Sequence, residues 1–202
     1  MSQLIRSYGV TITFSVVSTI LAVLVMGLLA YPLSRPNYYF KGPLSFFVFF
    51  TMLFSGGMVP NYLLMTNILH INDTMWVYIL PGLVNAYYVM ILRTAYRGIP
   101  NELVESAKID GAGELFICFR IMMPLCKASL ASIGFLFFVA KWNDWMSTLL
   151  YIRDPNLYSL QYLLQRILRE TEYLKQLALE GGMGGPVNFP TESYRFAMAI
   201  LA

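Results

Sequence analysis

Long apolar stretches without charged residues divide the chain. Residues 7–34 and 42–72 contain no Asp, Glu, Lys or Arg. About 20 residues of helix cross the apolar core of a bilayer, so such stretches predict membrane spans. The predicted full spans cover about residues 10–31, 43–65, 74–92 and 128–150, and a last span starts at 195–202. Glycine and proline at residues 56–60 predict an irregularity near the outer end of the second span, and Pro81-Gly82 lies inside the third.

The basic residues orient these spans. Segment 93–127 carries five Lys or Arg residues, and loop 34–42 carries two. Lys and Arg concentrate in cytoplasmic loops, so we expect both segments in the cytoplasm. The N-terminus and segment 151–194 are then expected outside. The outer N-terminus and the short last span lead us to expect that the chain is a truncated piece of a longer protein.

The composition supports an all-α, polytopic transmembrane bundle. Apolar residues make up 57% of the chain and charged residues 12%, against about 25% charged in soluble domains. The net charge of +3 is too small to indicate a nucleic-acid partner. Cys118, Cys126 and one His form neither a disulfide framework nor a zinc cluster. We expect no metal site, and both cysteines as buried apolar residues.

The predicted cytoplasmic segment 93–127 has the most specific pattern. Pro100 suits the start of a helix, where its missing N–H is no loss. Gly111 and Gly113 follow the last good helix former, where glycine can take the left-handed conformation that ends a helix. A second amphipathic run at 115–123 leads to a proline. The segment therefore predicts a helix, a glycine turn and a second helix outside the lipid.

This segment resembles the signature loop of the permease subunits of bacterial ABC importers, E-A-A-x3-G-x9-I-x-L-P. The positions that correspond to the pattern are Glu105, Ser106, Ala107, Gly111, Ile121, Met123 and Pro124. Ser106 and Met123 depart from the pattern, both mildly in size. Residues 85–93 and 142–145 resemble the flanks of the carbohydrate branch, the maltose-type permeases.

The resemblance implies a permease fold in the bacterial plasma membrane and three protein partners. These are a second permease subunit, a cytoplasmic P-loop ATPase that receives the loop, and an extracytoplasmic solute-binding protein. It implies that Glu105 contacts the ATPase and that Gly111 forms the turn, while Ala107 and Ala112 allow close approach. The chain contains no G-x-x-x-x-G-K-[ST], so we expect ATP on the partner ATPase and no cofactor on this chain.

Polar residues in the predicted spans are candidates for the solute path, because they are costly in lipid. Asn85 lies among tyrosines that include Tyr88, and Asn143 and Asp144 lie near the end of the fourth span. Sugars are commonly held by aromatic faces and a few amides. Two alternatives stay open: Asn85 hydrogen-bonds a neighbouring helix, and Asn143 and Asp144 cap a helix at the interface.

The outer segment 151–194 predicts an amphipathic helix at 158–178, from leucines at helical spacing. A glycine loop follows it, with Gly181, Gly182, Gly184 and Gly185. In maltose-type relatives a comparable loop reaches the docked binding protein, so the resemblance implies that role here. The alternative is a connector to the last span.

Two classes of function follow. The first is the permease of an importer for oligosaccharides or related carbohydrates, with an importer of amino acids, peptides or phosphonates as the alternative within that class. The second is a membrane enzyme acting on lipid-linked sugars, which needs a cluster of acidic, basic or metal-binding groups. His70 stands alone, and Asp73 and Asp144 have no partner set readable from the sequence. We therefore expect no catalytic residues.

Overall fold

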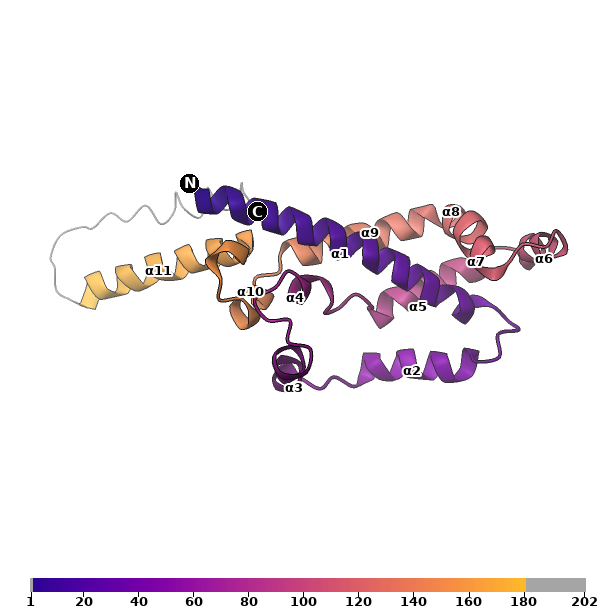
Figure 1. Ribbon diagram of the computed structural model, residues 1–202, viewed down its shortest axis with the longest axis horizontal. Coiled ribbons are helices and arrows are strands. Elements are labelled where there is room, and N and C mark those ends of the chain that lie inside the picture. Colours follow the sequence, from indigo (N-terminus) through magenta and orange to yellow (C-terminus); the bar gives the residue numbers. More distant parts are fainter. Residues whose placement is uncertain (1, 181–202) are drawn as a thin grey trace.

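The computed structural model describes residues 2–180, which form helices and no strand (Figure 1). The elements are α1 (Ser2–Ser34), α2 (Lys41–Leu53), α3 (Met58–Leu63), the π-helical turn η1 (Leu64–Ile68), α4 (Trp76–Ile79), α5 (Ala86–Arg97), α6 (Asn101–Ile109), α7 (Glu114–Ile117), the π-helical turn η2 (Cys118–Met122), α8 (Met123–Leu125), α9 (Lys127–Trp142), α10 (Met146–Tyr151), the 3-10 turn η3 (Pro155–Leu157) and α11 (Leu160–Glu180). The all-α prediction is confirmed.

Helix α1 forms the long axis of the structure, and α5 and α9 pack along it (Figure 1). Small residues at helical spacing, including Ser15, Ser18 and Ala22, lie buried on α1. A Cβ on Gly134 of α9 would lie 3.3 Å from Val23 Cγ2 of α1. Small side chains let apolar helices approach closely, which explains why these two helices pack so tightly.

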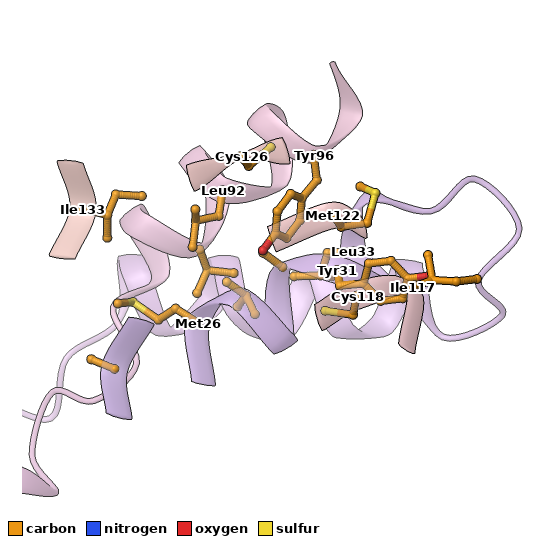
Figure 2. Close-up of a cluster of buried hydrophobic side chains, with 14 of the residues drawn as sticks. Met26, Tyr31, Leu33, Leu92, Tyr96, Ile117, Cys118, Met122, Cys126 and Ile133 are labelled. Atoms are coloured by element: carbon orange, nitrogen blue, oxygen red, sulfur yellow. The ribbon is translucent and has the colours of Figure 1, made fainter. Parts of the chain in front are cut away.

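A shared core joins α1 to the segments that follow α5. Figure 2 shows side chains from α1, α5, the α7–η2 segment and α9 meeting in one cluster, with Met26, Tyr31, Leu33, Leu92, Tyr96, Ile117, Cys118, Met122, Cys126 and Ile133. Both cysteines are free and buried there, as expected. Because these elements share one close-packed core, movement of one element is transmitted to the others.

The ends of α1 carry different parts of the chain. The α6–α7 pair and the loop after α1 lie near the C-terminal end of α1, whereas α10 and α11 lie toward its N-terminal end (Figure 1). Helix α11 packs there through Leu160 and Leu164, and the Leu160 N–H donates to Thr11 Oγ1 of α1 at 2.9 Å. The helix predicted at 158–178 is thus observed two residues later in the chain.

Three of the four predicted spans contain more than one helix. Span 43–65 divides into α2 and the α3–η1 pair, with Gly57 at φ +85° between them. Span 74–92 divides into α4 and α5 around Gly82 at φ +79°, and span 128–150 divides into α9 and α10. Glycine takes positive φ without a Cβ clash, which explains the breaks at Gly57 and Gly82.

Within residues 2–180, α1 is the one helix that is long and apolar enough to cross a membrane by itself. Two bent pairs meet that test jointly: α2 with residues 58–68, bent by 111°, and residues 114–125 with α9, bent by 82°. Counting each pair as one span gives up to three spans. Four full spans stay a prediction, and the start of a last span at 195–202 lies outside the described residues.

Lys141 of α9 donates hydrogen bonds to backbone carbonyl groups at the break between α4 and α5. Its ammonium donates to the carbonyl oxygens of Tyr78 at 2.6 Å and of Pro81 at 3.0 Å. A broken helix leaves carbonyl groups without their intrahelical partners, and in an apolar environment they need other donors. Lys141 is therefore a structural residue of this break.

Replacing Lys141 by methionine is expected to destabilise the protein by about 1–3 kcal/mol, because it leaves two carbonyl oxygens without a donor. In a chain of this size, the midpoint of thermal unfolding in detergent should fall by about 2–4 °C per kcal/mol. Lys127→Met is the matched control, since Lys127 is exposed at the other end of α9. Equal midpoints for both variants would contradict this role.

Candidate functional site

Helices α6 and α7 form an elbow, defined here as residues 101–122, and its turn depends on Gly111. Gly111 has φ +81°, and the turn is closed by hydrogen bonds from the N–H of Gly111 to Lys108 O at 3.0 Å and from the N–H of Ala112 to Ala107 O at 2.9 Å. The left-handed conformation predicted for Gly111 is confirmed. Gly113 has φ −74° and precedes α7 in an ordinary extended conformation.

The elbow has an inner and an outer face. Val104, Ile117 and Cys118 are buried in the shared core, and Ala107, Ala112 and Ile121 are half-buried against it. The small alanines thus let the elbow lie close to the chain's own core. The outer face, defined here as the exposed surface of the elbow, carries Glu105 and Ser106 together with large apolar side chains, namely Leu103, Ile109, Leu115 and Phe116, and Pro124 just after the elbow is exposed too. Ile109 is 86% exposed, so the face is apolar and open to a partner.

A polar strut ties the elbow to the end of α1. The Tyr31 hydroxyl donates to Glu114 Oε2 at 2.5 Å, and Glu114 Oε1 pairs with Lys108 Nζ at 2.5 Å. Arg35 lies over the Tyr31 ring, 5.3 Å from its centroid. The strut therefore joins α1, α6 and α7, which lie far apart in the sequence.

The hydrogen bonds of the strut, first from Lys108 and then from Tyr31, hold the pKa of the Glu114 carboxyl below its usual value. A carboxyl group whose pKa is lowered by folding stabilises the folded state above its unfolded pKa. This contribution is lost as the pH falls through the lowered value. The strut is thus intact at neutral pH and weakens only in acid.

Tyr31→Phe is expected to loosen the elbow, because a hydrogen bond to a charged group contributes about 1.5–3 kcal/mol. Amide hydrogen exchange in residues 114–122 should become about tenfold faster or more at neutral pH. Tyr38→Phe, at an exposed tyrosine in the loop after α1, is the control and should leave exchange unchanged. Exchange in Tyr31→Phe that matches the wild type would show that the strut does not hold the elbow.

A cavity of about 620 Å³ lies between the C-terminal end of α1 and the elbow. Leu28, Tyr31, Val104 and Leu115 give it apolar walls, and Glu105 lines it too. Glu105 makes no hydrogen bond or salt bridge among those found in residues 2–180. Its carboxylate is thus available to a partner that contacts the outer face of the elbow.

The candidate residues of the solute path have local structural roles. Asn85 caps α5 by accepting hydrogen bonds from the N–H groups of Tyr87 at 3.0 Å and Tyr88 at 3.4 Å. It lies directly before α5, next to the break within the predicted span 74–92. The role of Asn85 in the solute path and the alternative, a hydrogen bond to a neighbouring helix, both stay predictions. Tyr88 is half-buried and packs against the shared core.

Asn143 and Asp144 cap helix ends, which is the alternative that the sequence left open. The Asn143 side-chain amide donates to Val139 O at 2.9 Å, at the end of α9. The Asp144 carboxylate accepts from the Ser147 N–H at 3.0 Å and from the Ser147 hydroxyl at 2.7 Å, at the start of α10. The glycine loop with Gly181, Gly182, Gly184 and Gly185 lies outside the described residues.

No protein-family model matches the chain, but curated proteins do. It is 36% identical over 197 residues to the polygalacturonan/rhamnogalacturonan transport system permease protein YtcP of Bacillus subtilis, covering 98% of this chain and 68% of that protein. It is 36% identical over 200 residues to the protein LplC of Bacillus subtilis, covering 98% and 66%. It is 32% identical over 157 residues to the arabinooligosaccharides transport system permease protein AraQ of Halalkalibacterium halodurans, covering 76% and 55%.

The fold also matches a solved structure. A chain from the crystal structure of a bacterial ABC transporter involved in the import of the acidic polysaccharide alginate superposes with a TM-score of 0.80 and 26% sequence identity. The match covers 89% of this chain and 65% of that chain. This chain therefore spans about two thirds of the length of that structure and of its first two curated relatives.

Proposed function

Because the chain belongs to the family of carbohydrate ABC transporter permeases, we propose that it is the permease subunit of an ATP-driven importer. In this function its helices form part of the path of a carbohydrate across the bacterial plasma membrane. The chain catalyses no reaction itself, and ATP is bound by a partner ATPase. A second permease subunit completes the path, and an extracytoplasmic binding protein delivers the solute.

The outer face of the elbow is the proposed contact with the cytoplasmic ATPase. The observation that carries this proposal is the form of the elbow: a short helix pair with an exposed, unpaired Glu105 and apolar neighbours, closed by Gly111 at φ +81°. An apolar face with a few polar groups is typical of a protein interface. The outer face of the elbow lies beside the C-terminal end of α1, which the distribution of Lys and Arg predicts to be cytoplasmic.

The strut and the shared core give this contact a mechanical effect. The Tyr31 hydroxyl and the Glu114 carboxylate connect the elbow to α1, and the buried side chains of Figure 2 connect it to α5 and α9. A close-packed lever of this kind moves as a unit, which a transport cycle with rigid-body rearrangements requires. ATP-driven movement of the ATPase would thus reach the helices that line the path.

The names of the relatives favour a carbohydrate over an amino acid, a peptide or a phosphonate as the solute. One relative is named for polygalacturonan and rhamnogalacturonan, and another for arabinooligosaccharides. The transporter of the solved structure is involved in the import of alginate. Two of these three proteins are named for acidic polysaccharides. We therefore propose an oligosaccharide that contains uronic acids as the first solute to test.

The test is co-purification followed by an activity measurement. The full-length subunit is expressed with its candidate partner permease and ATPase and extracted from membranes, and a P-loop ATPase should be retained. Binding proteins loaded with oligogalacturonate or with neutral arabinooligosaccharides are then added, and the acidic sugar should stimulate ATP hydrolysis more. Absence of an ATPase would contradict the importer, whereas stimulation by the neutral sugar alone would contradict only the acidic solute.

A further inference from the structure

Four cationic side chains gather where α1, α2 and α5 meet at the end of the structure that holds the elbow. Arg35 follows α1, Lys41 begins α2, and Arg93 and Arg97 lie in the last turns of α5. Helix α2 packs against both α1 and α5, which brings these ends together. We call Arg35, Lys41, Arg93 and Arg97 the cationic cluster.

The lowered pKa values of Lys41 and Arg93 reflect desolvation and how close these charges lie to one another. The pKa of Lys41 is lowered by desolvation and then by the positive charges of Arg97, Arg93 and Arg35. The pKa of the Arg93 guanidinium is lowered by desolvation and by Arg97. Each charge in the cluster therefore lies close enough to repel another.

The chain supplies little negative charge to balance the cluster. Asp73 is the one acidic residue in positions 1–101, and its carboxylate accepts from the N–H groups of Arg153 and Asp154. Glu114 of α7 lies within the field of Arg35, but its ion pair is with Lys108, and Glu105 lines the same cavity as Arg35 without pairing with it. The cluster thus keeps its net positive charge.

One donor of the cluster is also unsatisfied. Within residues 2–180, Arg93 Nε is buried and has no hydrogen-bond partner, and the one acceptor found for Arg93 Nη1 is the weak acceptor Met90 Sδ at 3.8 Å. A buried donor without an acceptor costs free energy, which an anionic oxygen from outside the chain would recover. The cluster therefore has both the charge and the donors for an external anion.

The surroundings of the cluster identify the source of that anion. Tyr39 and Phe40, between Arg35 and Lys41, are 87% and 57% exposed, and α2 continues with exposed Phe46 and Phe47. Exposed aromatic side chains beside cations, at the end of an apolar helix, are typical of the bilayer interface. Basic pockets between helices on the cytoplasmic side bind anionic headgroups. The proposed ATPase contact lies on α6 and α7, which carry none of the four cations.

We propose that the cationic cluster binds the headgroup of an anionic phospholipid of the cytoplasmic leaflet, with its acyl chains along the exposed aromatic face of α2. The single negative charge of the lipid phosphate offsets part of the +4 charge that Arg35, Lys41, Arg93 and Arg97 share. Arg35 also contacts Met122 Sδ of the elbow at 3.7 Å, so the site adjoins the elbow on the side of α1.

Native mass spectrometry of the purified complex tests this site. The complex is exchanged into vesicles of phosphatidylcholine alone or of equal parts phosphatidylcholine and phosphatidylglycerol, and retained lipid is counted after extraction. The wild type should retain phosphatidylglycerol, and the Lys41→Gln/Arg97→Gln variant should bind it roughly 30-fold more weakly, since each cation near an anionic surface contributes about 1 kcal/mol. Excess inorganic phosphate, which lacks acyl chains, should not displace the lipid.

Two matched variants complete the design. The Lys41→Arg/Arg97→Lys variant keeps both charges and should retain the lipid. The Arg120→Gln/Lys127→Gln variant removes the same charge from exposed positions outside the cluster and should also retain it. Equal retention by the Lys41→Gln/Arg97→Gln variant and the wild type would overturn the proposal, as would equal loss in the Arg120→Gln/Lys127→Gln control. Release of the ATPase with unchanged lipid would assign the cluster to a protein contact instead.

Discussion

Valine in place of Gly111 is expected to abolish carbohydrate uptake and to release the ATPase from the purified complex. Gly111 has φ +81°, where a residue with a Cβ is strained by about 1–2 kcal/mol and a β-branched residue by more. No atom lies within 4 Å of the position that a Cβ would take, so the effect comes from the backbone. The turn would open, and the elbow would lose the shape that the ATPase contacts.

Gly113 offers a matched control for this variant. It lies two residues later, its Cβ position is also free of contacts, and its φ of −74° suits any residue. Gly113→Val should therefore leave uptake and ATPase retention near wild-type levels. Uptake is measured with labelled solute and retention by co-purification. Equal uptake and equal ATPase retention in the two variants would contradict a role for the left-handed turn in coupling.

Charge reversal at Glu105 is expected to reduce uptake at least about tenfold, with no loss of membrane insertion. Among the contacts found in residues 2–180, Glu105 makes no salt bridge within the chain, so its replacement costs little folding free energy. At an interface, an unfavourable charge contact costs several kcal/mol, and 1.4 kcal/mol already corresponds to tenfold in affinity. The Glu105→Lys variant should therefore fold but fail to hold the ATPase.

Glu102 is the control position for Glu105. It is exposed on the same helix, and Glu102→Lys makes the same change in charge. Lysine in the first turn also opposes the helix dipole, so this variant is the harsher test of α6 itself. Retained uptake in Glu102→Lys with loss in Glu105→Lys would assign the effect to the interface. Normal uptake in Glu105→Lys would contradict the role of Glu105.

The sequence predicted the parts of the fold that depend on local composition. The charge-free run at 7–34 corresponds to α1, and the pattern around Gly111 corresponds to the elbow and its left-handed turn. It did not predict the full division of the later spans, because apolar residues continue through the breaks. The gap after α9 holds Asn143 and Asp144 between apolar residues, and its capping contacts appear only in three dimensions.

The sequence also predicted only part of the candidate functional site. The spacing of Glu105 and Gly111 located the elbow, but the strut joins Tyr31 to a carboxylate 83 positions away, which no periodic pattern reveals. Asn85 had a readable signal, since Asn directly before a helix is a preferred N-cap. Lys141 had no readable signal in the sequence, because its partners are backbone carbonyl groups, which every residue carries.

The π-helical turn η2, which ends the elbow and precedes α8 and α9, gives the loop a geometric constraint. Such a turn holds one residue more than an α-helical turn, and each residue of an α-helix advances the chain by about 100° around the axis. The number of residues between Gly111 and Pro124 thus fixes the azimuth of the elbow relative to α9. Removing one residue from η2 would rotate the face with Glu105 by about a quarter of a circle. The length of the loop therefore sets an angle between the elbow and α9, a constraint that adds to those on the side chains of Glu105 and Gly111.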